Sequence, residues 1–385
     1  MSKQKQINLI LGATSLVQPL TGIGQYTLRL SQELEKNNQL QTSYFNGYAW
    51  SSSANVRSLP NIGKLKKFVS KYLPYAYEFR RIAQQKAFNL SDNKLKANVY
   101  HEPNFLPLEF DGPTVITVHD LSYIRHPEAH PYQRVRIMRK LLPAAIEKSN
   151  CIIADSHFTK HEIASEFAVD VNKIHVTHLG TSKEFYPRPP FEIQDILNKY
   201  KLIAGQYVLT VGTLEPRKNL IQVISAYQIM PAELALKFPL VIVGIKGWKE
   251  KTLLKELEIL LEQKKAFLLG YVPSADLPYI YCGARVFVFP SIYEGFGLPP
   301  LEAMACGTPI ITSNTSSIPE VVGQAGLMVN ISDVDMMKNH LVMVCEDDQL
   351  HAELSIAGLK QSKKFSWAEC ARQTFDAYQY ALNGQ

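Results

Sequence analysis

Short apolar runs rich in Val, Ile and Tyr alternate along the chain with longer segments of helical periodicity. Strands that alternate with helices in this way are typical of parallel βαβ units, so the pattern predicts an α/β fold. The predicted strands of the first half are 7–12, 41–46, 98–103, 114–120, 150–156 and 173–180, and those of the second half are 207–212, 240–244, 266–272, 285–290, 308–313 and 326–330. Each half therefore has enough strands for a doubly wound sheet of its own.

Between the two sets of strands lies the segment YPRPP at 186–190. Its prolines fit neither a sheet interior nor the middle of a helix, which is typical of a linker. We expect a first Rossmann-like domain at 1–186 and a second at 187–365, with a cleft between them. The segment 366–385 has the pattern of an amphipathic helix.

Composition supports two globular domains. At 385 residues the chain is longer than one hydrophobic core usually serves, and 46% hydrophobic with 20% charged residues is typical of a soluble protein. The five cysteines are scattered and form no CxxC pair, which argues against a disulfide framework and a zinc site and favours a reducing cytoplasm. The apolar run near the start is too short for a signal peptide or a membrane span, so we expect neither.

The stretch PSIYEGFGLPPLEAMACGTP, at 290–309, places two carboxylates among Gly, Pro and small apolar residues. It follows a predicted strand, and its glycines and prolines forbid a helix before the proline pair, so Glu294 is expected in the loop after the strand. Glu302 is expected in the first turn of the next helix. In open α/β sheets, ligands bind at the carboxyl ends of the strands, where helix N-termini present N–H groups to anions.

The residue types in this stretch indicate a sugar phosphate. Carboxylates pair well with neutral hydroxyls but not with phosphates, whereas the backbone amides of EGFG suit an anion. A purely structural alternative is that Glu302 complements the dipole of its helix. The glycine-rich loop and Glu294 together favour the ligand site.

The two glutamates resemble the E-x7-E signature of retaining glycosyltransferases of the GT-B fold, in family 4 (glycosyl transferases group 1). The resemblance continues in VGTLEPRKNL at 211–220 and SSIPEVVGQAGLMV at 316–329, and it covers nearly the whole chain. It implies two Rossmann-like doubly wound domains that face each other across a cleft. It also implies that the helix at 366–385 crosses back to the first domain.

The resemblance implies that the second domain holds a nucleotide-sugar donor. Glu294 would bond sugar hydroxyls and Glu302 the ribose, while Arg217 and Lys218 would neutralise the diphosphate as it leaves, because a departing diphosphate needs positive charge nearby. Many members of the family have arginine where this chain has Thr213, so the positive charge for the diphosphate depends on Arg217 and Lys218. Further donor contacts are expected from Val272 near the base and from the amides of Gly295, Phe296, Gly297 and Leu298.

Two features of the first domain are weak by themselves. TGIGQYT at 21–27 fails as a dinucleotide fingerprint because its glycines come well after the first strand. His119 and Asp120 end a predicted strand, and a lone histidine there is more often structural. The resemblance implies that the amide near Gly24 reaches the diphosphate and that His119 positions the sugar and stabilises the transition state. It implies no side-chain base, because the leaving phosphate accepts the proton of the acceptor in same-face substitution.

The pair Asp333 and Asp335 has the DxD spacing that another glycosyltransferase fold uses for divalent cations. Asp333 follows a predicted strand and precedes a predicted helix, so a helix N-cap is the favoured interpretation. We expect metal-independent transfer and no cofactor besides the donor substrate.

Basic and aromatic residues interleave at 57–86, and a second basic run, RVRIMRK, follows at 134–140. Such segments suit an anionic membrane surface, although a solvated basic face is an equal alternative. We expect a cytoplasmic protein, peripheral at the cytoplasmic face of the inner membrane, that reaches a glycan or lipid-linked saccharide acceptor. Nucleic-acid binding is not expected, because no recognised module accompanies the charge.

VGTLEPRKNL and TVHDLSYIRHPEAH look closest to bacterial mannosyltransferases of polysaccharide, O-antigen and lipopolysaccharide assembly, which favours GDP-mannose as donor. A UDP-hexose such as UDP-glucose is the alternative. A GT-B sugar epimerase or phosphorylase and a catalytically silent sugar-nucleotide-binding protein are the rival classes.

Overall fold

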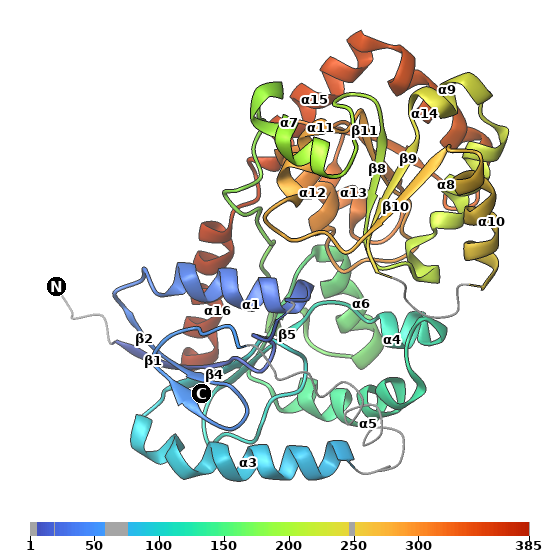
Figure 1. Ribbon diagram of the computed structural model, residues 1–385. Helices are drawn as coiled ribbons and strands as arrows, with labels where there is room; N and C mark the ends of the chain where they lie inside the picture. Colours follow the sequence, from blue (N-terminus) through green and yellow to red (C-terminus); the bar gives the residue numbers. More distant parts are fainter. Residues whose placement is uncertain (1–5, 19, 58–75, 246–250, 385) are drawn as a thin grey trace. The chain divides into compact units, whose positions relative to one another are not determined.

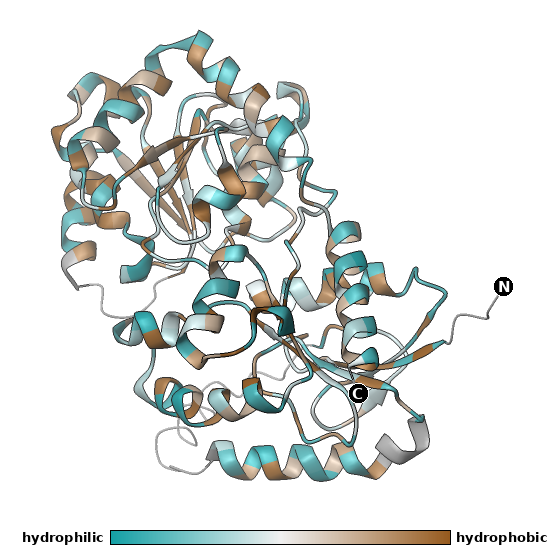
Figure 2. Cartoon of the chain, turned by 180° about the vertical axis from the view of Figure 1, so that it is seen from behind, coloured by the Kyte–Doolittle hydropathy of each residue, from teal (hydrophilic) through white to brown (hydrophobic). Residues whose placement is uncertain are grey.

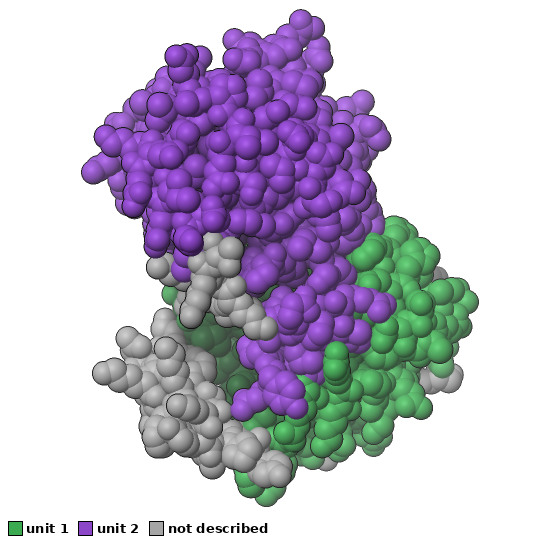
Figure 3. Space-filling view, turned by 90° about the vertical axis from the view of Figure 1, so that its right-hand side faces the viewer, with its two compact units in different colours: residues 1–121, 136–178, 367–385 green, residues 122–135, 179–366 purple. Residues whose placement is uncertain are grey.

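A computed structural model describes residues 6–18, 20–57, 76–245 and 251–384. The chain divides into two compact units (Figure 3). Unit 1 comprises 1–121, 136–178 and 367–385, and unit 2 comprises 122–135 and 179–366. The long segment of unit 2 begins at Leu179, whereas the sequence analysis expected the second domain from residue 187. Unit 2 also includes 122–135, a segment that the strand pattern gave no reason to separate from its neighbours.

The sheet of unit 1 has seven strands in the order β3-β2-β1-β4-β5-β6-β7 (Figure 1). All neighbours pair in parallel except β2 and β3. The short β3 was not predicted, because two residues are too few to show a period. The strands are β1 (Ile7–Gly12), β2 (Leu40–Phe45), β3 (Trp50–Ser51), β4 (Val99–Glu102), β5 (Thr114–Val118), β6 (Cys151–Ala154) and β7 (Ile174–Val176).

The sheet of unit 2 has six parallel strands in the order β10-β9-β8-β11-β12-β13. Three of them, β9, β11 and β12, are buried along their whole length, as expected for a parallel sheet that helices cover on both faces. Figure 2 shows these strands as hydrophobic, while the helices around them also carry hydrophilic turns. The strands are β8 (Val208–Val211), β9 (Leu240–Val243), β10 (Ala266–Gly270), β11 (Val286–Phe289), β12 (Ile310–Ser313) and β13 (Leu327–Val329).

Helices follow most strands, as the alternating pattern predicts. Those wholly or mostly within unit 1 are α1 (Gly22–Leu34), α3 (Ala76–Leu95), α5 (Tyr132–Lys148), α6 (His157–Phe167) and α16 (Trp367–Asn383). Those of unit 2 are α4 (Ser122–Arg125), α7 (Pro190–Lys199), α8 (Leu220–Ile229), α9 (Ala232–Lys237), α10 (Lys251–Glu262), α11 (Leu277–Gly283), α12 (Leu298–Ala305), α13 (Ile318–Val322), α14 (Val334–Glu346) and α15 (Asp348–Ser362). Short 3-10 turns are η1 (Pro127–Ala129), η2 (Val171–Lys173) and η3 (Pro216–Lys218).

The helix α16 is part of unit 1, although the chain reaches it only after all of unit 2. It packs along α1 and against strands β4 to β7. Tyr378 of α16 meets Nδ1 of His101 at 2.7 Å, and Nε2 of the same ring meets Thr117 at 2.8 Å. Burial lowers the pKa of His101 to about 3, so a neutral imidazole joins the helix to β4 and β5.

The helix α12 differs in one detail from the sequence expectation. It begins at Leu298, so both prolines lie inside its first turn. Glu302 therefore lies in the second turn and not in the first. Proline at the start of a helix costs no hydrogen bond, because the first N–H groups have no partner within the helix.

Among the described residues, no helix is both long enough and apolar enough to cross a bilayer.

Candidate functional site

In unit 2 the strand order reverses between β8 and β11, which are neighbours in the sheet. Loops at such a reversal leave the sheet in opposite directions and open a crevice for ligands at the carboxyl ends of the strands. The loop after β8 contains Arg217 and Lys218, and the loop after β11 contains Glu294. The topology thus places the three charged residues predicted from the sequence at one point of the fold.

These side chains are in direct contact. The Glu294 carboxylate accepts from Lys218 Nζ at 2.6 Å and pairs with an Arg217 guanidinium nitrogen at 3.0 Å. Arg217 also pairs with Glu215 at 2.8 Å and donates to the backbone carbonyl of Tyr293. Two cations and two carboxylates therefore form one nearly buried cluster.

Burial and charge act on this cluster in opposite directions. Burial alone would raise the pKa of Glu294, but Arg217 and Lys218 outweigh it and lower the pKa to about 2. Burial lowers the pKa of Lys218, and the attraction of Glu294 offsets part of that effect. We take both groups as ionised, because the 2.6 Å contact is that of a charge-assisted hydrogen bond.

The loop that contains Glu294 is held by hydroxyl groups that the sequence analysis did not single out. The amide of Glu294 donates to Ser316 Oγ at 3.0 Å, and Ser317 donates to the carbonyls of Glu294 and Phe296. Thr315 donates to the carbonyl of Ile292. The signal for these partners was the hydroxyl-rich run TSNTSS after β12, whose carboxyl end adjoins that of β11.

The glycine-rich loop leads directly into α12. Gly297 is its N-terminal boundary residue, with φ of +120°, and a Cβ there would lie 2.9 Å from Ile318. Only glycine takes this conformation without strain. The neighbouring Phe296 ring is buried and meets the edge of Phe365 with ring centroids 5.7 Å apart. The loop amides from Gly295 to Leu298 are thus part of a fixed turn.

Glu302 and Val272 lie elsewhere in unit 2. The Glu302 carboxylate accepts from the Tyr281 hydroxyl at 3.2 Å, so α11 orients it. Val272 follows β10 at its carboxyl end, and its side chain is buried.

Gly24 and His119 belong to unit 1. Gly24 lies in the first turn of α1, where its amide donates to the side chain of the N-cap residue Thr21 at 3.4 Å. A Cβ at Gly24 would lie 2.9 Å from a backbone oxygen of Ser15 and from Leu20, so this position admits no side chain without a shift. The start of α1 has the backbone N–H groups that an anion requires.

His119 follows β5, and each of its ring nitrogens faces an acceptor. Nδ1 lies 2.8 Å from Asp155 and Nε2 lies 2.9 Å from the backbone carbonyl of Pro103. Burial lowers the pKa of His119, but the Asp155 carboxylate and the carbonyl outweigh it, so the pKa is raised. Both ring nitrogens are therefore placed to donate a hydrogen bond. The sequence analysis did not single out Asp155, because it lay inside a predicted strand. Its position near the end of that strand was the signal that could have found it.

A second carboxylate that sequence reasoning missed lies at the strand-order reversal of unit 1, between β1 and β4. Glu102 ends β4, is 5% exposed and accepts from the Tyr100 hydroxyl at 2.9 Å. A Cβ on Gly12, at the end of β1, would come within 2.5 Å of its Oε2. Burial raises the pKa of Glu102 to about 7, even though Tyr100 and Arg81 act in the opposite direction.

The structure confirms the N-cap interpretation of Asp333, whose side chain accepts from the amide of Met336 at 2.8 Å. Its neighbour Asp335 is exposed and pairs with Lys338 at 3.5 Å. Both carboxylates thus have a partner close to them in the sequence.

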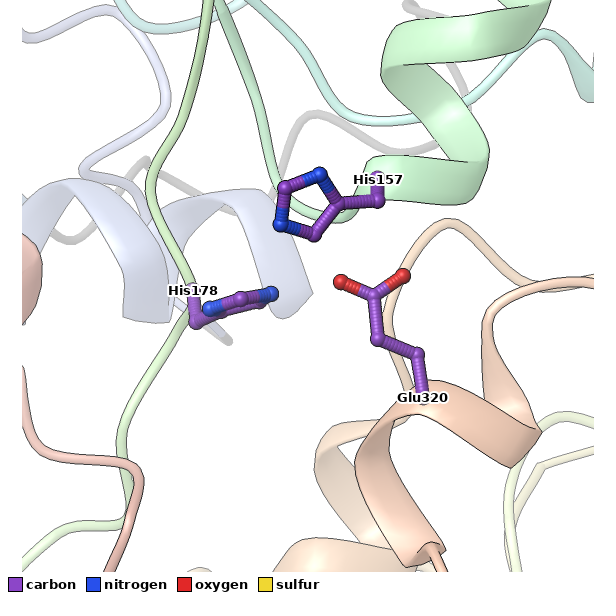
Figure 4. A group of neighbouring side chains, drawn as sticks. All are labelled: His157, His178 and Glu320. Atoms are coloured by element: carbon purple, nitrogen blue, oxygen red, sulfur yellow. The ribbon is translucent and has the colours of Figure 1, made fainter.

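A histidine pair in unit 1 is the other group with metal-binding chemistry. His157 and His178 have ring centroids 5.6 Å apart (Figure 4), and Glu320, also drawn there, lies on α13 of unit 2. Two imidazoles fall short of the three or four protein ligands of a zinc site. Within the described part of unit 1, the pair does not complete a metal site.

Models of two families match the chain: "Glycosyltransferase Family 4" over 20–185 and "Glycosyl transferases group 1" over 195–361. The chain is also 37% identical to the O-antigen chain mannosyltransferase B of Escherichia coli, over 97% of this chain and 99% of that protein. The chain belongs to the family 4 glycosyltransferases. The resemblance read from its motifs is thereby confirmed, and the chain is an enzyme of this class.

Solved structures support the same fold. The sucrose-phosphate synthase of Thermosynechococcus elongatus superposes with a TM-score of 0.72 at 20% identity, and the two chains cover 99% and 100% of each other. The Anabaena protein HepE, solved in complex with UDP and glucose, gives 0.71 at 16% identity, with 97% and 100% coverage. The predicted α/β class, with two Rossmann-like doubly wound sheets of the GT-B type, is confirmed.

Proposed function

We propose that this glycosyltransferase transfers mannose from GDP-mannose to a glycan or lipid-linked saccharide, with retention and without a metal. The observation that supports it most directly is the cluster of Arg217, Lys218 and Glu294 at the strand-order reversal of unit 2. The choice of mannose is supported by the name of the Escherichia coli relative, which is a mannosyltransferase of O-antigen chains.

In the proposed donor complex, the diphosphate takes Arg217 and Lys218 as partners. Glu294 then exchanges part of its contact with these cations for hydroxyls of the sugar, which are neutral donors that suit a carboxylate. The amides of Gly295, Phe296, Gly297 and Leu298 contact the sugar and diphosphate from their fixed turn. Glu302 binds the ribose, Val272 adjoins the base, and the amide near Gly24 adds a donor from unit 1.

We propose same-face substitution, in which the leaving diphosphate accepts the proton of the acceptor hydroxyl. Two properties of the site support the absence of a side-chain base or nucleophile. Glu294 is an anion held by two cations, which makes it a poor nucleophile. His119 has acceptors at both ring nitrogens and so has no lone pair available for a proton. Its proposed role is to position the sugar and to stabilise the transition state.

Arg217 and Lys218 supply the positive charge that a metal would otherwise bring to the leaving group. Transfer should therefore keep most of its rate in EDTA. Abolition by EDTA with rescue by manganese would contradict the metal-independent proposal.

We propose further that unit 1 contacts an anionic membrane, where a lipid-linked acceptor resides, at the cytoplasmic face of the inner membrane. Most of the first basic segment, residues 58–75, lies outside the described residues. The second, 134–140, lies on α5, where Arg134, Arg136, Arg139 and Lys140 are exposed. Next to it, α3 and α5 border a cavity of about 400 Å³. Its lining combines four apolar or aromatic side chains with the cations Arg81, Arg136 and Lys140, the carboxylates Glu78 and Glu109, and Gln85.

Liposome flotation tests the membrane proposal. Binding should be stronger to anionic than to neutral vesicles and should weaken when the four basic residues of α5 are replaced by Gln. Equal binding to both vesicles, or binding to neither, would refute it.

A UDP-hexose donor is the second candidate, because HepE was solved with UDP and glucose. Isothermal calorimetry of the purified protein with GDP, UDP, ADP and their sugar conjugates, in EDTA, separates the two. Binding of GDP and GDP-mannose alone supports the proposed donor, and a UDP preference replaces it. Epimerisation of a free sugar nucleotide without an acceptor would revive the rival epimerase class, and binding without turnover would indicate a silent sugar-nucleotide-binding protein.

A further inference from the structure

Two thiols lie at the C-terminal ends of α11 and α12 in unit 2. Cys282 is in the last turn of α11 and is partly exposed, whereas Cys306 follows α12 and is buried. The two side chains are close enough that each thiol shifts the pKa of the other. We infer that Cys282 and Cys306 form a peroxide-sensitive dithiol that closes to a disulfide between α11 and α12.

Other contacts confirm that the ends of the two helices adjoin. Cys306 Sγ lies 3.7 Å from the carbonyl of Pro278, which is one helical turn before Cys282. Thr308 donates to the carbonyl of Tyr281 at 2.6 Å. Both contacts join the residues around Cys306 to the last turns of α11, which contain Cys282.

Cys282 also has a cation beside it. An Arg188 guanidinium nitrogen lies 4.0 Å from Cys282 Sγ, and the guanidinium is stacked over the rings of Tyr186 and Tyr279, at 3.9 and 4.5 Å. A fixed cation stabilises a thiolate, which is the reactive form. Arg188 belongs to the proline-rich segment 186–190, to which the proposed transfer chemistry gives no role.

The electrostatic balance favours a reactive Cys282. The carbonyl of Tyr186, 3.2 Å from Cys282 Sγ, and the negative end of α11 both oppose a thiolate. The Cys306 thiol lowers the pKa of Cys282, burial raises it, and Arg188 lowers it further, with a result of about 7. Burial raises the pKa of Cys306. Cys282 is thus suited to attack an oxidant. Cys306 is suited to attack the oxidised Cys282 sulfur afterwards.

The chemistry needs a peroxide as oxidant. The Cys282 thiolate attacks one peroxide oxygen, the O–O bond breaks, and the leaving hydroxide is protonated to water, which leaves a sulfenic acid on Cys282. The Cys306 sulfur then attacks the Cys282 sulfur, the S–O bond breaks and a second water leaves. Two thiols and one hydrogen peroxide thus give one disulfide and two waters.

The disulfide would act on the ligand site through its neighbours. Tyr281, next to Cys282, donates to Glu302, which lies one turn before Cys306 on α12. A covalent link beside this contact would fix the distance between the two helices. Any effect on nucleotide binding rests on the proposed function, whereas the disulfide itself does not.

The first test measures alkylation of the native protein by iodoacetamide at different pH values. At pH 7, a thiol of pKa 7 should react about threefold faster than one of pKa 8.5, because its larger thiolate fraction outweighs its lower nucleophilicity. Arg188→Gln should slow the alkylation of Cys282 by up to that factor and shift its midpoint to higher pH, without change at Cys345. Equal rates in both proteins would refute the role of Arg188.

The deciding test treats the protein with hydrogen peroxide and maps its peptides without reduction. A cross-linked pair containing Cys282 and Cys306 should appear, should be lost after dithiothreitol, and should be absent in Cys282→Ser, in which Cys306 stays a thiol. Cys345→Ala, a cysteine elsewhere in unit 2, should leave the cross-link unchanged. Accumulation of sulfinic acid on Cys282 beside a free Cys306 would overturn the proposal.

Calorimetry with the reduced and oxidised protein tests the coupling to Glu302. A loss of nucleotide affinity on oxidation that dithiothreitol restores supports the coupling. Unchanged nucleotide affinity in an oxidised protein whose cross-link has been mapped would refute the coupling to Glu302 but not the disulfide. Absence of nucleotide binding in the reduced protein would count against the proposed function and not against the dithiol.

Discussion

At the residue scale, the main property of the loop after β11 is that its carboxylate, Glu294, pairs with two cations at once. The Glu294 carboxylate lies 2.6 Å from Lys218 Nζ and 3.0 Å from a guanidinium nitrogen of Arg217. A diphosphate can take these cations only in competition with the carboxylate. The same residue would therefore oppose the binding of a bare nucleotide and favour the binding of a sugar nucleotide.

Glu294→Gln should separate these two effects. Affinity for GDP should rise, because the amide no longer competes for Arg217 and Lys218. Transfer should fall about 10- to 100-fold in kcat/KM, because hydrogen bonds from sugar hydroxyls to a charged group are worth about 1.5–3 kcal/mol. Calorimetry and initial rates measure the two quantities.

Glu302→Gln is the matched comparison. Its side chain accepts from the Tyr281 hydroxyl, and GDP affinity should fall instead of rise if Glu302 binds the ribose. The same direction of change in both variants would argue against the assigned division of roles.

The buried Glu102 gives a pH-dependent stability. Its folded pKa of about 7 lies above its ordinary value of 4.5, so its stabilising contribution is complete below pH 4.5 and is lost as pH rises through 7. The difference of 2.5 units corresponds to about 3 kcal/mol. Glu102→Gln should therefore gain up to about 3 kcal/mol in free energy of unfolding, relative to the wild type, between pH 4.5 and 8.

Urea denaturation across this pH range measures the difference. Glu147→Gln, which changes an exposed glutamate of the same unit, is the control, and its difference from the wild type should stay flat. A flat difference for Glu102→Gln as well would show that the carboxyl titrates normally.

The site residues differ in how far the sequence could predict them. Arg217, Lys218 and Glu294 follow predicted strands, and because those strands are neighbours at a strand-order reversal, the side chains meet. Ser316 and Ser317 were not foreseen, because a serine that supports a loop has no periodic pattern. Asp155 and Glu102 were not foreseen for a related reason, since each is a single polar residue at the end of a strand.

At the element scale, helix starts in this chain depend on local polar contacts. Asp333 caps α14, and Thr21 caps α1 with its hydroxyl. The start of α12 instead has two prolines, which fix the backbone of its first turn. The sequence analysis placed Glu302 one turn too early, because helix propensity does not decide which residue near a proline pair begins the helix.

Asp333→Ala should lower the free energy of unfolding of unit 2 by about 1 kcal/mol, the usual cost of a lost N-cap. Asp335→Ala should cost less than about 0.5 kcal/mol, because its ion pair is exposed. Thermal unfolding with and without manganese completes the test. Manganese should raise the Tm of neither the wild type nor the variants, and a rise that Asp333→Ala abolishes would indicate a metal ligand.

At the scale of the whole molecule, the alternation of strands and helices was enough to predict two sheets. The composition of the units was harder to predict, because unit 1 gathers three separate segments of the chain. The helix α16 belongs to it through contacts such as that of Tyr378 with His101. A sequence pattern gives the apolar face of such a helix but not the sheet that the face covers.

Tyr378→Phe should destabilise unit 1 by about 1–3 kcal/mol, because Nδ1 of the buried His101 would lose its partner. Hydrogen exchange measured by mass spectrometry should show faster exchange in α1, β4 and β5 and no change in β8 to β13. Tyr380→Phe, on the same helix and 39% exposed, is the control. Uniform loss of protection in both units would mean that they unfold together.

The interrupted composition of unit 1 also bears on the order of events during synthesis. Domains usually fold as units in the order in which they leave the ribosome. Here the segments of unit 1 that emerge first must wait for α16, which is translated after residues 179–366. Unit 2 can therefore complete its sheet first, while the exposed side of β4 to β7 awaits its covering helix. A stall of the ribosome before codon 367 would leave the nascent chain with one finished half and one apolar surface open to chaperones.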